Sequence, residues 1–160
     1  MDFSSKQGLY FDARMLLIQE QLAAGEKICN LRFRGVSMLP MLRQEKDSVE
    51  LSPLPEELKK YDLPVYRRAD GQYVMHRIVA VKDDCYICLG DNTIALERIL
   101  PEQMIGVVSA FYRGNRRIEV DAPGYQVNCR LWRLTWPCRS LWNKARVMKQ
   151  RITKLLRKRI

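Results

Sequence analysis

The first recurring pattern of apolar residues lies within residues 5–24 and has the period of an α-helix. Four apolar side chains recur there at spacings of four, three and four residues: Phe11, Met15, Ile18 and Leu22. Gly25 follows the last of them, and glycine is the residue that most often ends a helix. The pattern therefore predicts an amphipathic N-terminal helix that buries one face.

Beyond Gly25 the pattern changes to short, loosely alternating segments of the kind that form β-strands. Six or seven strands are expected, within residues 27–33, 48–54, 63–68, 73–82, 85–90, 104–114 and 117–122. Turn sequences separate three pairs of them: Asp70-Gly71, Asp83-Asp84 and Gly114-Asn115. Strands joined so closely, without helices between them, pair antiparallel. The expected fold class is mainly β, a small coiled antiparallel fold with an N-terminal helix and a basic helical tail.

Charge divides the chain into two unequal parts. Residues 129–160 contain eleven Lys and Arg and no Asp or Glu, whereas residues 1–128 contain 17 basic and 18 acidic side chains. The net charge of +10 therefore belongs to the C-terminal segment, and the rest of the chain is nearly neutral. We expect three parts: a helix in residues 1–26, a β domain in residues 27–122 and a tail in residues 123–160.

The tail combines tryptophans and arginines with an apolar stripe. Trp132, Trp136 and Trp142 lie among the basic residues, and five apolar residues follow at helical spacing: Leu141, Ala145, Met148, Ile152 and Leu155. Such a segment suits an anionic membrane surface, where each basic residue contributes roughly 1 kcal/mol. Nucleic-acid binding by phosphate contacts and stacking is the less favoured hypothesis. A partner protein and packing on the chain's own body also stay open. The tail is expected to lie outside the active site.

The cysteines and the N-terminal residues bear on where the protein works. The chain has five scattered cysteines, and its N-terminus lacks the apolar run of a secretory signal. No apolar run reaches the roughly 18 residues that span a bilayer. We expect reduced thiols and a cytoplasmic protein, associated with the inner face of the membrane through its tail. Cys85 and Cys88 form a C-x-x-C, but residues three apart on a strand point to opposite faces. No metal or cofactor is therefore expected.

Three polar residues are candidates for chemistry. Ser37 follows a predicted strand in "GVSMLP", His76 is the single histidine of the chain, and Asp91 lies in the turn "GDN". Each has an ordinary structural interpretation as a turn serine, a hydrogen-bonded strand histidine or a turn aspartate. Together they suffice for acyl transfer, because an imidazole can accept the serine proton and a carboxylate can stabilise the resulting imidazolium.

Four boxes follow one another in order between residues 27 and 122: "GVSMLPML", "YVMHRIV", "LGDN" and "MIGVV". In this order they resemble the signal-peptidase superfamily of serine proteases, which includes the self-cleaving repressors. Bacterial signal peptidases and the repressors use a lysine base. His76 at the matching position makes the chain more similar to the archaeal and endoplasmic-reticulum signal peptidases. The resemblance implies Ser37 as nucleophile, His76 as base and Asp91 as the carboxylate that orients the base.

The resemblance leaves one role open and includes two departures. Glu97 matches a second acidic residue of the reticulum-type enzymes, so either carboxylate could orient His76, and Asp91 is preferred. The backbone N–H of Ser37 is the implied oxyanion donor, and Gly35 stands where signal peptidases commonly have a serine that adds a second donor. A predicted amphipathic helix replaces the transmembrane anchor that precedes the serine box in signal peptidases.

The expected function is that of a signal-peptidase-like serine endopeptidase that cleaves a peptide or protein, for example a leader peptide. The alternative is a non-catalytic module of the same fold, which holds a peptide or a partner in the groove. Met38 and Met41 flank the serine box, and we expect both to pack in the core.

Overall fold

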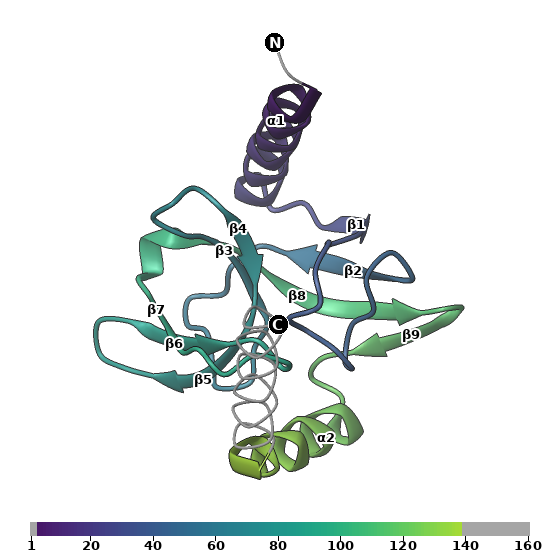
Figure 1. Ribbon diagram of the computed structural model, residues 1–160, viewed down its shortest axis with the longest axis vertical. Coiled ribbons are helices and arrows are strands. Elements are labelled where there is room, and N and C mark those ends of the chain that lie inside the picture. The colour runs from purple at the N-terminus through teal and green to yellow at the C-terminus, as the bar shows by residue number, and fades with distance from the viewer. Residues whose placement is uncertain (1–2, 139–160) are drawn as a thin grey trace, which may run out of the picture.

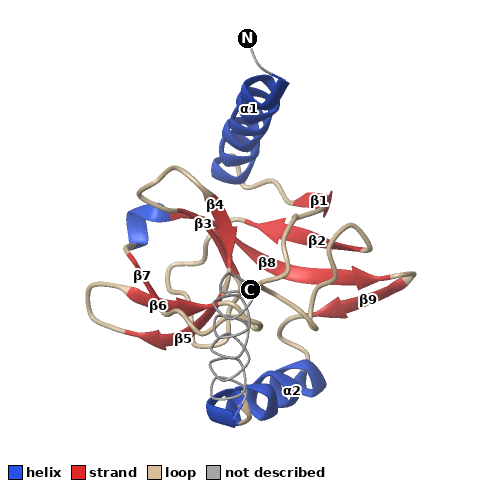
Figure 2. Cartoon of the chain, viewed as in Figure 1, coloured by secondary structure: helices blue, strands red, loops and turns tan. Residues whose placement is uncertain are grey.

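The computed structural model describes residues 3–138, and nine strands form the middle of this part of the chain (Figure 1). The strands are β1 (Ile28–Leu31), β2 (Asp47–Ser52), β3 (Pro64–Arg67), β4 (Tyr73–Met75), β5 (Arg77–Val81), β6 (Tyr86–Leu89), β7 (Glu97–Ile99), β8 (Met104–Arg113) and β9 (Arg116–Glu119). Helices α1 (Phe3–Ala23) and α2 (Pro123–Leu134) lie at opposite ends of the strands (Figure 2), and a short 3₁₀ helix, η1 (Pro101–Gln103), precedes β8.

The strands form two antiparallel sheets. The larger sheet has the order β1-β2-β8-β3-β4, and β9 also pairs with β8. The smaller sheet has the order β5-β6-β7. The prediction of a mainly β, antiparallel fold with helices near both ends is therefore confirmed.

The C-terminal half of helix α1 packs against the larger sheet through part of the apolar stripe that its sequence predicts, and the helix projects outward from the strands (Figure 1). Met15, Ile18 and Leu22 are buried in the main core, whereas the intervening positions 16 and 17 are exposed. Leu22 packs on Gly106 of β8, where a Cβ would lie 2.9 Å from the Leu22 Cδ1 atom. A residue with a Cβ at this position would have to displace the Leu22 side chain.

The single long strand predicted for residues 73–82 is wrong. The chain instead forms β4 in the larger sheet, interrupts its pairing at His76 and continues as β5 in the smaller sheet. Local alternation cannot reveal such a change, because both halves keep the apolar character of a buried strand. The consequence is that His76 lies at the junction between the two sheets.

Three predicted hairpins are confirmed, since β5 also pairs with β6 across the Asp83-Asp84 turn, and one strand is additional. The turn at Gly71, with φ of +86°, joins β3 to β4, and Gly114, with φ of +63°, joins β8 to β9. Strand β7 was not predicted from the sequence, because three residues are too few for an alternating pattern to be recognised. It matters for the site, since it begins at Glu97.

Two hydrophobic clusters hold the fold together. The main cluster lies on the larger sheet and includes residues of both long helices. The smaller cluster has six buried members, which come from both sheets and the loop before β3: Leu58, Tyr66, Ile78, Cys88, Ile99 and Met104. The smaller cluster is therefore the apolar contact between the two sheets.

The beginning of the predicted tail belongs to the folded body. Helix α2 starts at Pro123, and its Tyr125 and Cys129 side chains are buried in the main cluster. The helical stripe predicted from Leu141 to Leu155, together with Trp142, lies outside the described residues. None of the helices within residues 3–138 has the length and apolar content to cross a bilayer.

Candidate active site

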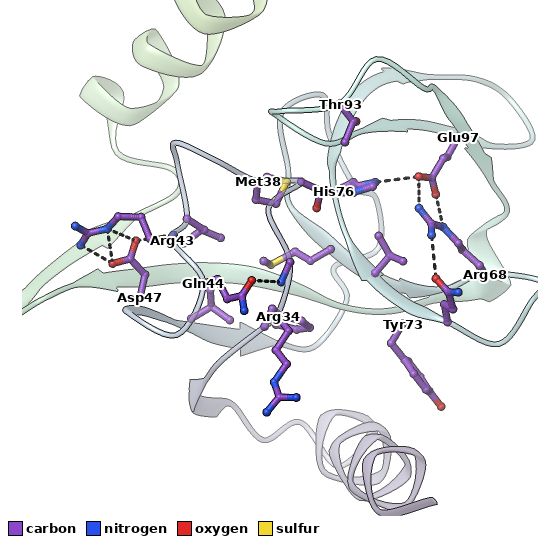
Figure 3. Close-up of a pocket in the computed structure, with 18 of the residues that line it drawn as sticks. Arg34, Met38, Arg43, Gln44, Asp47, Arg68, Tyr73, His76, Thr93 and Glu97 are labelled. Carbon is purple, nitrogen blue, oxygen red and sulfur yellow. Dashed lines mark hydrogen bonds and ion pairs between the residues drawn. The ribbon is translucent and has the colours of Figure 1, made fainter. Parts of the chain in front are cut away.

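The structure brings Ser37 and His76 into one cleft, which has a volume of about 380 Å³. Ser37 lies in the turn-rich loop between β1 and β2, His76 lies at the junction of β4 and β5, and Glu97 at the start of β7 also lines the cleft. Figure 3 shows His76 and Glu97 pointing toward one another on one side of it. Three segments far apart in sequence therefore meet in the site.

The loop that carries Ser37 is fixed at both ends. Gly35 has φ of +120°, a conformation that L side chains rarely adopt, and its N–H donates to Gln44 Oε1 at 3.1 Å. After the serine, Met38 and Met41 are buried in the main core, as expected. Ser37 itself is half-buried between these anchors and lines the cleft.

The Gly90-Asp91-Asn92 turn is hydrogen-bonded to the serine loop. The backbone N–H of Asn92 donates to the Ser37 carbonyl at 2.7 Å, and its side-chain amide donates to the Val36 carbonyl at 3.1 Å. A Cβ at Gly90 would lie 2.8 Å from the Ser37 carbonyl oxygen and 3.0 Å from His76 Nε2. Glycine is therefore required at the point where the serine loop and the imidazole approach each other.

His76 is held through its Nδ1 atom. The Tyr66 hydroxyl lies 3.1 Å from Nδ1, and Glu97 Oε1 lies 3.2 Å from it. The same hydroxyl donates its proton to Glu97 Oε2 at 2.9 Å, so it can only accept from the imidazole. The neutral ring therefore carries its proton on Nδ1 and presents the Nε2 lone pair toward Gly90 and the serine loop.

Glu97 remains ionised in this position. Burial raises the pKa of Glu97, but hydrogen bonds from Arg68 and Tyr66 and the charge of His76 outweigh it, so that the net shift is downward. Arg68 contributes both its Nε and a terminal nitrogen to the carboxylate. A charged carboxylate thus lies where it can orient the imidazole and stabilise its protonated form.

Burial lowers the pKa of His76 below its ordinary value, and the nearby charge of Glu97 opposes this shift only in part. The residue is only 3 % exposed. A histidine with a lowered pKa is neutral at pH 7 and can act as a proton acceptor there. The electrostatics of the site therefore favour a general base.

Asp91, the carboxylate that the sequence favoured, is bound by Arg77. Its two oxygens accept hydrogen bonds from Arg77 Nε at 2.9 Å and from an Arg77 terminal nitrogen at 2.7 Å, and both side chains are buried. Arg77 also donates to the Tyr61 carbonyl and to the Tyr125 hydroxyl of α2. The geometry thus assigns Asp91 to the anchoring of its turn, and it places Glu97 beside the Nδ1 atom of His76.

The remaining walls of the cleft combine apolar and polar side chains. Apolar lining comes from Phe33, Met38, Leu42, Val49 and Met75, and polar lining includes Arg34, Gln44 and Gln72. Asp47 also lines it and is bound by Arg43 through two nitrogens. The cleft therefore offers both apolar surface and hydrogen-bonding groups to a ligand.

Among residues 3–138, no group of three His, Cys, Asp or Glu side chains could hold a metal ion. Cys85 and Cys88 are both buried, and burial raises the pKa of the Cys88 thiol to about 12. The Cys85 sulfur accepts a hydrogen bond from Arg98 Nε at 3.2 Å. The C-x-x-C pair therefore contributes to packing.

Tyr66, Arg68 and Arg77 are site residues that the sequence did not single out. Tyr66 and Arg68 lie in a strand pattern typical of any buried β segment, and their contacts with Glu97 span about thirty positions of the chain. Only Arg77 had a signal in the sequence, namely its position next to His76.

Comparisons with known proteins add nothing further, because no family model, curated protein or solved structure matches the chain.

Proposed function

We propose that this protein is a serine endopeptidase of the signal-peptidase type, with Ser37 as nucleophile, His76 as general base and Glu97 as the carboxylate that orients His76. One observation carries the proposal. In a single cleft, His76 is held at Nδ1 by Tyr66 and Glu97, while its Nε2 atom faces the turn that supports Ser37. The ordered sequence boxes support the same roles for Ser37 and His76, and they include Glu97 as one of two candidate carboxylates.

The proposed reaction proceeds by acyl transfer. The Ser37 hydroxyl oxygen attacks the carbonyl carbon of the scissile peptide, and its proton passes to His76 Nε2. The tetrahedral intermediate collapses when His76 returns that proton to the leaving amine, which breaks the peptide bond and leaves an acyl ester on Ser37. Water then attacks the ester carbon while His76 Nε2 accepts one of its protons, and His76 returns that proton to the Ser37 oxygen as the ester bond breaks. The product acid is released, ionises to the new carboxylate, and the serine and the neutral imidazole are restored. The Ser37 backbone N–H is the proposed donor to the oxyanion.

The supporting residues have positional roles in this scheme. Asn92 holds the backbone of Val36 and Ser37, and Gly90 provides the space for the imidazole beside them. The ion pair between Arg77 and Asp91 fixes the turn that contains Gly90 and Asn92. In signal peptidases a serine commonly stands at the position of Gly35, so this chain lacks the hydroxyl that adds a second oxyanion donor at that position.

A cytoplasmic location is part of the proposal. All five cysteines are free, and Cys29 and Cys138 are exposed. Exposed thiols persist in a reducing compartment and are rare in oxidising ones. The proposed substrates are therefore peptides or proteins that are accessible from the cytoplasm.

The test is cleavage of a mixed peptide library, in which new termini are identified by mass spectrometry. Ser37→Ala and His76→Ala should each reduce cleavage by about 10³-fold or more, and the double variant should be no worse, because neither group acts without the other. Ser48→Ala, in β2 outside the cleft, is the matched control and should cleave normally. If the protein binds peptides but no cleavage depends on Ser37, it is instead a peptide-binding module of the same fold.

A further inference from the structure

Helix α2 has apolar side chains on two opposite faces. One face is buried on the body through Tyr125 and Cys129. On the other side Val127, Leu131 and Leu134 are 52 %, 57 % and 74 % exposed. At 3.6 residues per turn these three positions form one stripe, opposite the buried pair. We call Val127, Leu131 and Leu134 the outer face of α2.

The inner face is firmly attached. Trp132 Nε1 donates to the Asp91 carbonyl at 3.1 Å, and the Tyr125 hydroxyl accepts from Arg77 at 3.0 Å. Helix α2 therefore has a fixed orientation on the body, and its outer face points away from the core. A surface helix of this kind is ordinarily polar on that side, so the exposed apolar stripe indicates a binding surface.

The charge around the outer face indicates the partner. Arg130 is exposed beside the stripe, and the sequence from Ala122 to Ile160 contains eleven Lys and Arg and no Asp or Glu. An apolar stripe in a strongly cationic segment is complementary to a bilayer with anionic headgroups, which offers negative charge above an apolar interior. We propose that the outer face of α2 docks on an anionic membrane surface.

Docking through this face has a consequence for the cleft. Trp132 and Trp136 bind the carbonyls of Asp91 and Thr93, and these residues belong to the turn that supports the serine loop and to the cleft wall. A bilayer bound to the outer face would therefore be held at a fixed position relative to the cleft. Substrates attached to or emerging from that surface would be favoured over those in solution.

The test is co-sedimentation of the full chain with vesicles of equal parts phosphatidylglycerol and phosphatidylcholine, compared with vesicles of phosphatidylcholine alone. We expect binding to the anionic vesicles that weakens as salt is added. The triple variant Val127→Ser/Leu131→Ser/Leu134→Ser should lose at least about tenfold in partitioning. Leu134→Ser alone, at the most exposed position, should lose less in the same direction and guards against a folding defect in the triple variant.

The matched control is Leu16→Ser/Leu17→Ser on α1, where two leucines of similar exposure, 57 % and 60 %, lie at the opposite end of the molecule. This variant should bind anionic vesicles as the unmodified protein does. Equal binding by the outer-face variants would overturn the proposal, since charge alone would then suffice. Light scattering that shows a dimer, converted to a monomer by the triple variant, would overturn it in favour of a second copy of the chain.

Discussion

Glu97 and Asp91 are two carboxylates with different surroundings, and their replacement should separate catalysis from stability. Glu97→Gln keeps the shape of the side chain but removes the charge beside His76, so kcat should fall by about 10²-fold or more. Arg68, which is partly exposed, can then turn to water, and stability should change little. Activity assays and urea unfolding of the same preparation measure both effects.

Asp91→Asn is the matched comparison. It leaves the charge of Arg77 buried without a carboxylate, and breaking such a pair costs about 3–5 kcal/mol. Unfolding should therefore shift strongly, whereas the remaining folded protein should keep most of its activity. A large loss of kcat in a stable Asp91→Asn protein, with normal activity in Glu97→Gln, would reverse the assignment of the two residues.

The pH dependence of cleavage follows from the burial of His76. Burial lowers the pKa of His76 below the ordinary value of about 6.5. Since the base must be neutral, kcat/KM should rise with pH, bend at a value below the ordinary one and be level at pH 7. Glu97 raises this pKa, so Glu97→Gln should move the bend to still lower pH. A bend at or above the ordinary histidine value in the unmodified protein would contradict the proposed state of His76.

At the scale of elements, α2 should be required for a stable fold. Chains ending after Ala122 lose Tyr125 from the main cluster, together with its contact to Arg77, and removal of a buried aromatic side chain alone costs about 3–5 kcal/mol. Urea unfolding should show this loss, whereas a chain ending after Cys138 keeps α2 and should unfold near the midpoint of the full chain. Equal unfolding midpoints for all three chains would show that α2 contributes nothing to the stability of the fold.

The elements also differ in how far the sequence predicts them. The stripe of α1 and the hairpins at Gly71 and Gly114 have local signals, and the structure has them where they were expected. The change of sheet at His76 has none, because the pairing partner of a strand is decided by residues far away in the sequence. Helix α2 was interpreted as part of a peripheral tail because tryptophan and arginine suit a membrane and a protein surface equally.

The sequence singled out Ser37 and His76, the proposed nucleophile and base, but it left the choice of carboxylate open. Ser37 and His76 were accessible through their sequence boxes, and the structure places both in one cleft. The choice between Asp91 and Glu97 depends on where each carboxylate is held, and each of the two is bound by a different arginine. Arg77 binds Asp91, whereas Arg68 holds Glu97 beside the imidazole. Distances between side chains on different strands decide this, and no spacing in the sequence encodes them.

For the whole molecule, the site exists only while the two sheets are in contact. Ser37 belongs to a loop of the larger sheet, Glu97 to the smaller sheet, and His76 to the junction. The smaller cluster that joins the sheets has six buried residues, many fewer than the main cluster. Because regions with fewer buried apolar contacts open at lower free energy, the smaller sheet should separate before the larger one unfolds.

Activity should therefore be lost at a lower urea concentration than the hydrogen-exchange protection of β2 and β8. The matched pair Ile78→Val and Ile105→Val removes one methylene from the smaller and the main cluster respectively, at about 0.5–1.5 kcal/mol each. Ile78→Val should widen the interval between inactivation and loss of protection, because it weakens only the contact between the sheets. Ile105→Val should shift loss of protection toward lower urea and narrow the interval. If activity and protection disappear together in all three proteins, the two sheets unfold as one unit, and the site is as stable as the fold that carries it.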